Sequence, residues 1–436
     1  MPSLLDALYA LAILALSPWL VVRSFRTGRY RRHLRDKLIG PSRPLSDGSR
    51  PVVWFHGVSV GEVHLLRQVV RAFRERHPDW QVVVSSTTDT GLAEARKYFT
   101  DLVVLPYPFD FSWACRRAIR AVSPRLVVLA ESELWPNFLA AANRAGVPVV
   151  VINGRMSPRT FRRNARAGWL TRRLLFSQVW AFGMQSETYA GHLRSLSVPA
   201  ERVHVTGNVK YDGVLLDRDN PKTRDLRELL CIAPTDLVWV AGSTHDPEER
   251  IVLAVFRRLR PQFPDLRLVL VPRAPERFDE VAGLIGAAPL PCVRRSALTT
   301  GNTVPRDGVL LIDTLGELAA VWGLATIGFT GGSLNDKRGG QSMIEPAGLG
   351  VPVVFGPHTW NFKDAVAGLL EAGGAVRVQD ETELEREVGR LLGAPELRAR
   401  MGTAARAFVL AQQGATARTL DLLDQVIAGT REAARR

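Results

Sequence analysis

Short apolar runs alternate with longer amphipathic segments from about residue 51 onward. The runs are rich in β-branched residues, which is typical of strands that are buried on both faces. The segments between them, such as residues 62–76 and 90–98, have the length and pattern of helices. This alternation predicts an α/β fold with a parallel, doubly wound sheet. Strands are predicted over residues 52–55, 81–85, 102–105, 126–129 and 147–152.

The same alternation weakens and then restarts in the second half of the chain. Charged residues, Pro and Asp gather over residues 211–235, which indicates a linker. A chain of 436 residues also exceeds what one hydrophobic core usually serves. We therefore expect two α/β domains, followed by helices in the Ala-rich, basic tail. Strands of the second domain are predicted over residues 237–241, 266–271, 308–311, 325–330 and 351–355.

The amino terminus carries an apolar stretch over residues 4–22, broken by Asp6, Ser17 and Pro18. About twenty apolar residues suffice for a membrane-spanning helix, so this stretch is just long enough. No Lys or Arg precedes it, and basic residues follow it, which favours an uncleaved anchor with the rest of the chain on the cytoplasmic side. A helix lying in the membrane interface and a buried helix are the alternatives. The basic residues are Arg23, Arg26, Arg29, Arg31, Arg32, Arg35 and Lys37.

The chain is strongly basic, with 57 Lys and Arg against 43 Asp and Glu, a net charge of +14. This balance favours an anionic partner such as a membrane surface or a phosphorylated substrate. No recognised nucleic-acid-binding module accompanies it, so we expect no nucleic-acid partner. The three cysteines form no CxxC pair, which argues against a disulfide framework and a zinc site.

Carboxylates and a lysine follow the predicted strands of the first half. Ligands of open parallel sheets bind at the carboxyl ends of strands, which is where these residues fall. Glu62 ends the segment His-Gly-Val-Ser-Val-Gly-Glu and is suited to general-base chemistry, although it could simply complement a helix dipole. Glu131 and Glu133 follow another strand, and Lys210 lies beside a Gly-Asn pair just before the linker.

Arginines crowd the segment that follows Asn153, interleaved with aromatic and aliphatic residues. A basic amphipathic helix of this kind suits a membrane surface or a phosphate-bearing lipid. An ordinary solvated face is the alternative. The candidates for an acceptor or membrane surface are Arg155, Arg162, Arg163 and Arg166.

The second half carries glycine-rich turns and an arginine at the same edge of its predicted sheet. Residues 242–245 and the glycine-rich region from residue 331 to residue 340 could offer backbone N–H groups to an anion, with Arg273 nearby. By themselves these features indicate only a nucleotide-like ligand.

Eight segments, in order and spacing, resemble the signature blocks of bacterial 3-deoxy-D-manno-octulosonic acid (Kdo) transferases. The resemblance runs from the apolar amino terminus to about residue 380. The blocks are HGVSVGE, ESELWPN, INGRMS, GNVKYD, GSTHDPEE, PRAPERF, DTLGEL and GGQSMIEPAGLGVPVVFGPHTWNF.

The resemblance implies a GT-B fold, with two Rossmann-like domains and an inter-domain cleft, plus an amino-terminal membrane-anchor helix at the cytoplasmic face of the inner membrane. It implies an inverting glycosyltransferase that moves Kdo from CMP-Kdo to a lipid A precursor in lipopolysaccharide core biosynthesis, without a metal or other cofactor. The expected parts are an anchor and basic segment (residues 1–37), an acceptor domain (38–212), a linker (213–235), a CMP-sugar donor domain (236–405) and carboxy-terminal helices (406–436).

The same resemblance implies roles for individual residues. Glu62 would be the general base, and Glu131 and Lys210 would stabilise the transition state. The CMP site would comprise Pro272, Arg273, Leu315, Gly316, Glu317, Ser342, Met343, Ile344 and Glu345.

Two positions depart from the usual pattern of the family. Ala274 stands where a His usually follows Pro-Arg, and Gln341-Ser342 replaces His-Asn after the paired glycines. These changes indicate altered donor contacts. A GT-B transferase that uses a UDP-sugar on a lipid-linked or cell-wall acceptor is the alternative enzyme, and a non-catalytic binder of polyanions on the membrane is the alternative from another class.

Overall fold

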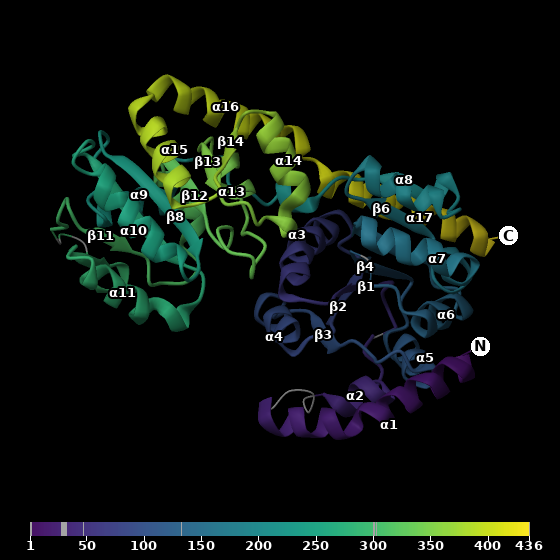
Figure 1. The fold of residues 1–436 in the computed structure, drawn as a ribbon. Helices are drawn as coiled ribbons and strands as arrows, with labels where there is room; N and C mark the ends of the chain where they lie inside the picture. Colours follow the sequence, from purple (N-terminus) through teal and green to yellow (C-terminus); the bar gives the residue numbers. More distant parts are fainter. Residues whose placement is uncertain are drawn as a thin grey trace. The chain divides into compact units, whose positions relative to one another are not determined.

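The computed structural model describes residues 2–27, 33–46, 48–131, 133–299, 301 and 303–435. The chain divides into two compact units (Figure 1). Unit 1 comprises Met1–Gly213 and Gln413–Arg436, and unit 2 comprises Val214–Gln412. Each unit is built on a seven-stranded parallel sheet covered by helices, so the expected α/β architecture is confirmed.

The sheet of unit 1 has the strand order β3-β2-β1-β4-β5-β6-β7. Its strands are β1 (Val52–Gly57), β2 (Gln81–Ser86), β3 (Val103–Pro106), β4 (Leu126–Ala130), β5 (Val149–Gly154), β6 (Ala181–Met184) and β7 (Val203–Val205). Its helices are α1 (Pro2–Thr27), α2 (Leu34–Ile39), α3 (Val60–Arg76), α4 (Asp89–Tyr98), α5 (Ser112–Val122), α6 (Pro136–Arg144), α7 (Pro158–Leu174), α8 (Glu187–Ser195) and α17 (Ala415–Arg435).

The sheet of unit 2 has the strand order β10-β11-β9-β8-β12-β13-β14. Its strands are β8 (Leu237–Thr244), β9 (Leu266–Pro272), β10 (Cys292–Arg294), β11 (Val309–Leu311), β12 (Ile327–Thr330), β13 (Val353–Phe355) and β14 (Ala375–Arg377). Its helices are α9 (Pro221–Leu229), α10 (Glu248–Leu259), α11 (Phe278–Ala287), α12 (Leu318–Leu324), α13 (Ile344–Gly348), α14 (Lys363–Glu371), α15 (Glu381–Gly393) and α16 (Pro395–Gln412).

Strand β1 shows why the apolar runs of the sequence lack a polar alternation. Val52 and Trp54 pack into the core on one face of the sheet, whereas Val53 and Phe55 pack into the core on the other. Because successive side chains point to opposite faces, a strand covered by helices on both sides must be apolar throughout. The sheet therefore holds the ends of its central strands rigidly.

The carboxy-terminal helix closes the core of the amino-terminal unit, which corrects the expected domain boundaries. Apolar residues of α17, including Leu420, Leu423 and Val426, pack in the same core as α3. The expected linker of residues 213–235 also contains α9, which packs on α12 and places Leu226 in a core of unit 2. Both differences arise because tertiary packing, which the sequence pattern does not show, assigns a helix to its unit.

The amino-terminal apolar stretch forms the helix α1, which lies beside α5 in unit 1 (Figure 1). Within the described part of the chain, no helix combines the length and the apolar character needed to cross a membrane. The expected membrane-spanning anchor is therefore not shown. Arg29, Arg31 and Arg32 of the basic segment lie outside the described residues.

Candidate active site

The turn after β1 holds the carboxylate of Glu62 at the end of the sheet. Glu62 lies in the first turn of α3, and its Oε2 accepts a hydrogen bond from the Val58 N–H at 2.7 Å. Its Oε1 accepts a second from the Ser59 hydroxyl at 3.2 Å. At Gly57 an added Cβ would lie 3.1 Å from the Glu62 Cβ, so a residue without a side chain lets the carboxylate fold back over the turn.

Burial changes the acidity of this carboxylate. Desolvation is the largest cause that raises the pKa of Glu62, to about 7, and the charges of Glu131 and Glu133 raise it further. The hydrogen bonds from Val58 and Ser59 oppose this shift. A carboxylate with a pKa near neutrality is a stronger base than an ordinary one and is still about half ionised near pH 7, so Glu62 has the properties of a general base.

Glu131 lies directly after β4 and is the acidic partner of two cations. Its backbone has φ 60°, a left-handed conformation that is uncommon for a residue with a side chain. Its Oε2 lies 3.4 Å from the Arg155 Nε, and its Oε1 lies 3.8 Å from the Lys210 Nζ. Its side chain is 16% exposed, whereas both cations are substantially exposed. Glu131 therefore holds two positive charges at the edge of the sheet, close enough to Glu62 to influence its pKa.

Asn153 positions Lys210 and was missed by the sequence analysis. It precedes Arg155 at the end of β5, has φ 52° and is fully buried. Its Oδ1 accepts a hydrogen bond from the Val209 N–H at 3.0 Å, which ties the short helix η3 (Val209–Tyr211) to the sheet. Lys210 lies in this helix. The Ile-Asn-Gly-Arg block contained the signal, because Asn is one of the few residues that tolerates this backbone conformation.

Arg155 therefore lies with Glu131 and Lys210. The sequence pattern instead predicts that Arg155 forms an acceptor or membrane surface together with the arginines of α7. The structure thus brings Glu62, Glu131 and Lys210, predicted from distant parts of the sequence, to one edge of the sheet of unit 1 and adds Arg155 to them.

His56, in the same block as Glu62, has a structural role. Its ring is fully buried and stacks on Tyr107, with the ring centroids 3.7 Å apart. Its Nδ1 lies 2.9 Å from the Ser85 hydroxyl. Desolvation lowers the pKa of His56 to about 3, so the imidazole is neutral and serves as packing beneath the turn.

The predicted donor residues of unit 2 form a second group. Ser342 donates a hydrogen bond to Glu345, and the charge of Arg273 also acts on this carboxylate. Burial nevertheless raises the pKa of Glu345. The structure therefore brings Arg273, Ser342 and Glu345 together, and each can offer a polar atom to a ligand.

The other residues predicted to bind the donor differ in how much of their side chains is exposed. Leu315 is 72% exposed, and Gly316 beside it has φ 85°. The Glu317 carboxylate already accepts hydrogen bonds from Thr314 and from Arg295, the latter at 2.8 Å. Pro272, Met343 and Ile344 are buried, so their side chains are not exposed to a ligand.

The carboxylate of Glu248 accepts hydrogen bonds from backbone N–H groups that the sequence pattern predicted to bind an anion. Glu248 is fully buried at the start of α10. It accepts hydrogen bonds at 2.7 to 3.0 Å from the N–H groups of His245, Gly332, Ser333 and Leu334. The expectation that the loops at residues 242–245 and 331–333 present these groups to a phosphate is therefore wrong. Glu248 instead joins the two loops, and the signal was the paired glutamates of the GSTHDPEE block.

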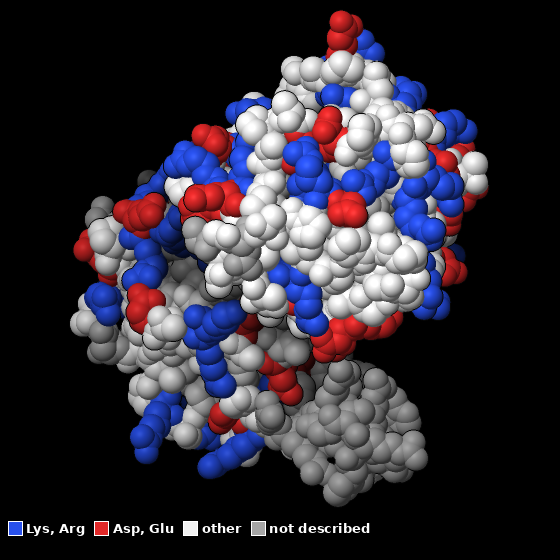
Figure 2. Space-filling view, turned by 90° about the vertical axis from the view of Figure 1, so that its left-hand side faces the viewer, with Lys and Arg blue, Asp and Glu red and all other residues white. Residues whose placement is uncertain are grey.

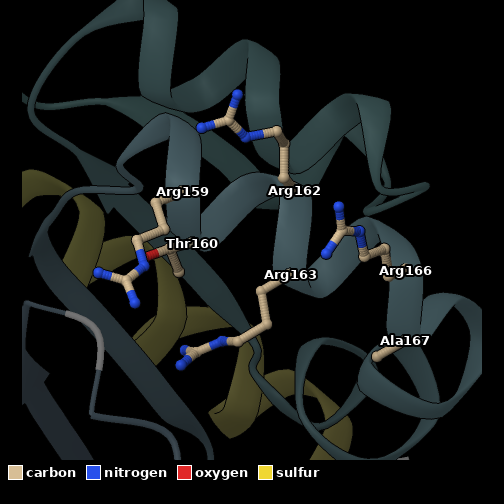
Figure 3. Close-up of a pocket in the computed structure, with 6 residues that line it drawn as sticks. All are labelled: Arg159, Thr160, Arg162, Arg163, Arg166 and Ala167. Carbon is tan, nitrogen blue, oxygen red and sulfur yellow. The ribbon is translucent and has the colours of Figure 1, made fainter.

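The predicted basic surface forms a hollow on α7 (Figure 3). Its volume is about 840 Å³, and four arginines and Thr160 contribute to its wall. Arg159 and Arg163 extend to one side of the helix, and Arg162 and Arg166 extend to another (Figure 3). None of the four is joined by an ion pair to a carboxylate among the described residues. The hollow therefore suits an anionic ligand.

Curated relatives resemble the chain over most of its length. A family model described as "3-Deoxy-D-manno-octulosonic-acid transferase (kdotransferase)" matches residues 26–213. The 3-deoxy-D-manno-octulosonic acid transferase of Bordetella pertussis is 35% identical over 432 residues, which cover 95% of this chain and 98% of that protein. The Haemophilus influenzae enzyme of the same name is 33% identical over 92% of each chain. The chain belongs to the Kdo transferase family.

Solved structures support the two-domain fold of this Kdo transferase family member. The UDP-GlcNAc 2-epimerase from Neisseria meningitidis superposes with a TM-score of 0.59 at 16% identity, over 86% of this chain and all of that one. A glycosyltransferase from Rickettsia africae gives 0.58 at 12% identity, over 87% of this chain and 99% of that one. At such identities the likeness concerns the fold alone, an α/β two-domain glycosyltransferase fold.

Gln341, which stands where the family usually has His, contacts a histidine of unit 2. The Gln341 Nε2 lies 3.3 Å from the His245 Nε2, so the amide can hydrogen-bond with the imidazole. Burial and three nearby arginines lower the pKa of His245 to about 4, which keeps the ring neutral and able to accept. Gln341 thus contacts the loop that Glu248 holds.

Among the described residues, no group of three or more His, Cys, Asp or Glu side chains could hold a metal ion.

Glu62→Gln should lower kcat by on the order of 10²-fold or more, because an amide cannot accept the proton that a general base removes. The substitution keeps the shape of the side chain, so the affinity for CMP, measured by titration calorimetry, should not change. Turnover near that of the wild type would show that Glu62 only caps α3.

The pH dependence of kcat/KM should report the raised pKa of Glu62. The base is active when ionised, so kcat/KM should fall about tenfold per pH unit well below pH 7 and level off above it. Glu131→Gln removes a charge that raises this pKa, so the acid limb should move to lower pH while the maximum falls. Profiles measured from about pH 5 to 9 test this; an acid limb that stays in place in Glu131→Gln contradicts the coupling.

Proposed function

We propose that this protein is an inverting, membrane-associated glycosyltransferase that moves Kdo from CMP-Kdo to a lipid A precursor in the assembly of the lipopolysaccharide core. Kdo transfer follows from membership of the family. The single observation that carries the proposed mechanism is the buried Glu62 carboxylate beside the Glu131–Lys210 pair.

In the proposed reaction, Glu62 removes the proton from a hydroxyl group of the acceptor. The hydroxyl oxygen then attacks the anomeric carbon of Kdo on the side opposite CMP. The bond between that carbon and the phosphate oxygen breaks, and CMP leaves with the electron pair. Glu131 holds Lys210 and Arg155, and these cations stabilise the negative charge that develops during transfer.

We propose that the donor binds to unit 2 without a metal ion. Arg273 supplies a charge for the phosphate of CMP, Ser342 and Glu345 supply polar contacts, and the exposed Leu315 lies on the turn predicted to contact CMP. Because CMP leaves as a phosphate monoester, fixed cations and backbone dipoles are a sufficient form of stabilisation in this proposal.

The acceptor in this proposal is an anionic lipid, and its phosphate binds at the α7 arginines. Four guanidinium groups lie within the first half of α7 and repel one another, and α7 has no acidic residue in its first turn. A phosphate among them would relieve this repulsion and accept bidentate hydrogen bonds.

We further propose that α1 associates with the cytoplasmic face of the inner membrane. The Asp6 carboxylate accepts hydrogen bonds from the N–H and hydroxyl groups of Ser112, at 2.8 and 2.6 Å, and the Tyr9 hydroxyl donates one to Asp110 at 3.1 Å. These contacts fix one side of the helix to unit 1. Exposed apolar side chains that could enter the lipid are those of Leu4, Leu8, Leu11 and Leu14.

The product test combines donor, acceptor and metal. Purified protein incubated with CMP-Kdo and a tetra-acylated lipid A precursor should give a product heavier by one or more Kdo units in a mass spectrum. EDTA should not reduce the yield. Loss of product with EDTA and recovery with Mg²⁺ would contradict metal independence, and transfer from a UDP-sugar in place of CMP-Kdo would contradict the donor.

Replacing Arg162, Arg163 and Arg166 by Ser should raise the KM for the lipid acceptor by about 10²-fold, since each basic contact to an anionic lipid is worth about 1 kcal/mol. The KM for CMP-Kdo should stay constant, and the effect should shrink at high salt. As a matched control, replacing Arg386, Arg390 and Arg400 of unit 2 removes the same charge and should leave both constants unchanged. An unchanged acceptor KM in the α7 variant would mean that the lipid binds elsewhere.

Replacing Leu4, Leu8 and Leu11 by Gln should reduce co-sedimentation with anionic phospholipid vesicles by more than 10²-fold in affinity, because each leucine buried in lipid contributes about 1.5 kcal/mol or more. Activity on a detergent-dispersed acceptor should persist, since Asp6 and Tyr9 still hold the helix. Leu410→Gln, at an exposed leucine of α16, is the control. Equal vesicle binding by the triple variant and the control would contradict the role of α1.

A further inference from the structure

A second hollow lies in the wall of unit 1 next to the arginine hollow of α7. Its volume is about 120 Å³. Two residues, Thr160 and Arg163, line both hollows. Apart from these and Asn164, its lining is apolar and comes from β5, β6, α8, the segments that flank α7 and the loop before α6: Leu134, Val151, Met156, Leu175, Phe176, Phe182, Met184 and Leu193.

The apolar lining decides which kind of group the second hollow can take. Eight of the eleven lining residues are apolar, so most of the wall offers water no hydrogen-bond partner and favours an apolar ligand, while Thr160, Arg163 and Asn164 form its polar part. With about 30 Å³ for a group the size of water, 120 Å³ has room for about four methylene-sized groups. That is too small for a ring system and suits the end of a single alkyl chain.

The helix that covers this hollow packs loosely. No side chain of α7 is fully buried, and its backbone breaks at Gly168, where φ is 49° and ψ is −122°. Phe161 is only half-buried, where it packs against the core and stacks on His192 with ring centroids 4.6 Å apart. A helix held in this way leaves unfilled space between itself and the sheet, whereas the rest of the core of unit 1 contains fully buried side chains.

We propose that the second hollow binds the end of one acyl chain of the lipid acceptor whose phosphate binds at the adjoining arginines. This inference rests on the proposed function and adds a chain-binding site to it. The shared wall of Thr160 and Arg163 places an anion site and an alkyl site side by side, which is the order of groups in a phosphorylated, acylated glycolipid. Burial of about four methylenes is worth on the order of 10²-fold in binding.

The test fills the hollow and compares two acceptors. Asn164 is half-buried in its wall, so Asn164→Phe places a ring where the chain end would lie. The control is Ala165→Phe, which adds the same ring at the next, exposed position of α7. KM is measured for a tetra-acylated lipid A precursor and for the same phosphorylated disaccharide stripped of its acyl chains. Leu175→Phe, a milder change in the same wall, is the second variant, and a thermal melt checks that each variant is folded.

Asn164→Phe and Leu175→Phe should raise the KM for the acylated acceptor by at least tenfold and leave the KM for the stripped acceptor and for CMP-Kdo unchanged. Ala165→Phe should change none of them. An equal rise for both acceptors, or no rise for either, in the folded variants would overturn the acyl-chain site. Absence of Kdo transfer by the wild-type protein to either acceptor would instead contradict the proposed function, so the two failures are distinguishable.

Discussion

The structure depends on how a buried carboxylate is hydrogen-bonded at the carboxyl end of a parallel sheet. Taking such a group out of water costs free energy unless donors replace the solvent. Glu248 of unit 2 and Glu62 of unit 1 meet this requirement in different ways. Four backbone N–H groups donate hydrogen bonds to Glu248, although burial still raises its pKa. Glu62 has one N–H and one hydroxyl, remains partly accessible, and keeps a raised pKa. Burial raises the pKa of both carboxylates, and Glu62 differs from Glu248 in remaining partly exposed.

The sheet order explains why residues far apart in sequence meet. Strands β1, β4 and β5 are neighbours in the centre of the sheet of unit 1, and their carboxyl ends carry Glu62, Glu131 and Arg155. Asn153 then attaches the helix of Lys210 to the same edge. Glu131 and Asn153 both have left-handed backbone conformations, uncommon for Glu and tolerated by Asn, that the packed strands on either side maintain. The chemistry of the site therefore follows from core packing.

Much of this could be predicted from sequence, because apolar runs and strand-end motifs are local signals. The runs gave the central strands, and the motif blocks gave Glu62, Glu131 and Lys210. Strands β6, β7, β10 and β14 were not predicted. The edge strands β7, β10 and β14 span three residues each and are incompletely buried, and the buried strand β6 spans only four residues, so none of them gives a long apolar run. The role of Glu248 and the attachment of α17 to unit 1 were also not predicted from the sequence. Both depend on partners more than 80 residues away, which no local pattern contains.

The net positive charge of the chain does not show where on the molecule the surplus basic side chains lie. Figure 2 shows basic and acidic side chains intermixed over much of one face. In unit 2, for example, Arg277 pairs with Glu249 at 2.6 Å and Arg294 with Asp313 at 2.7 Å. Such pairs cancel charge locally and are worth little binding energy to a distant anion. On α7 the arginines have no such ion pair with a described carboxylate, so their mutual repulsion persists until an anion arrives. In the proposed complex, a phosphorylated lipid would relieve this repulsion and fill the hollow beneath the helix.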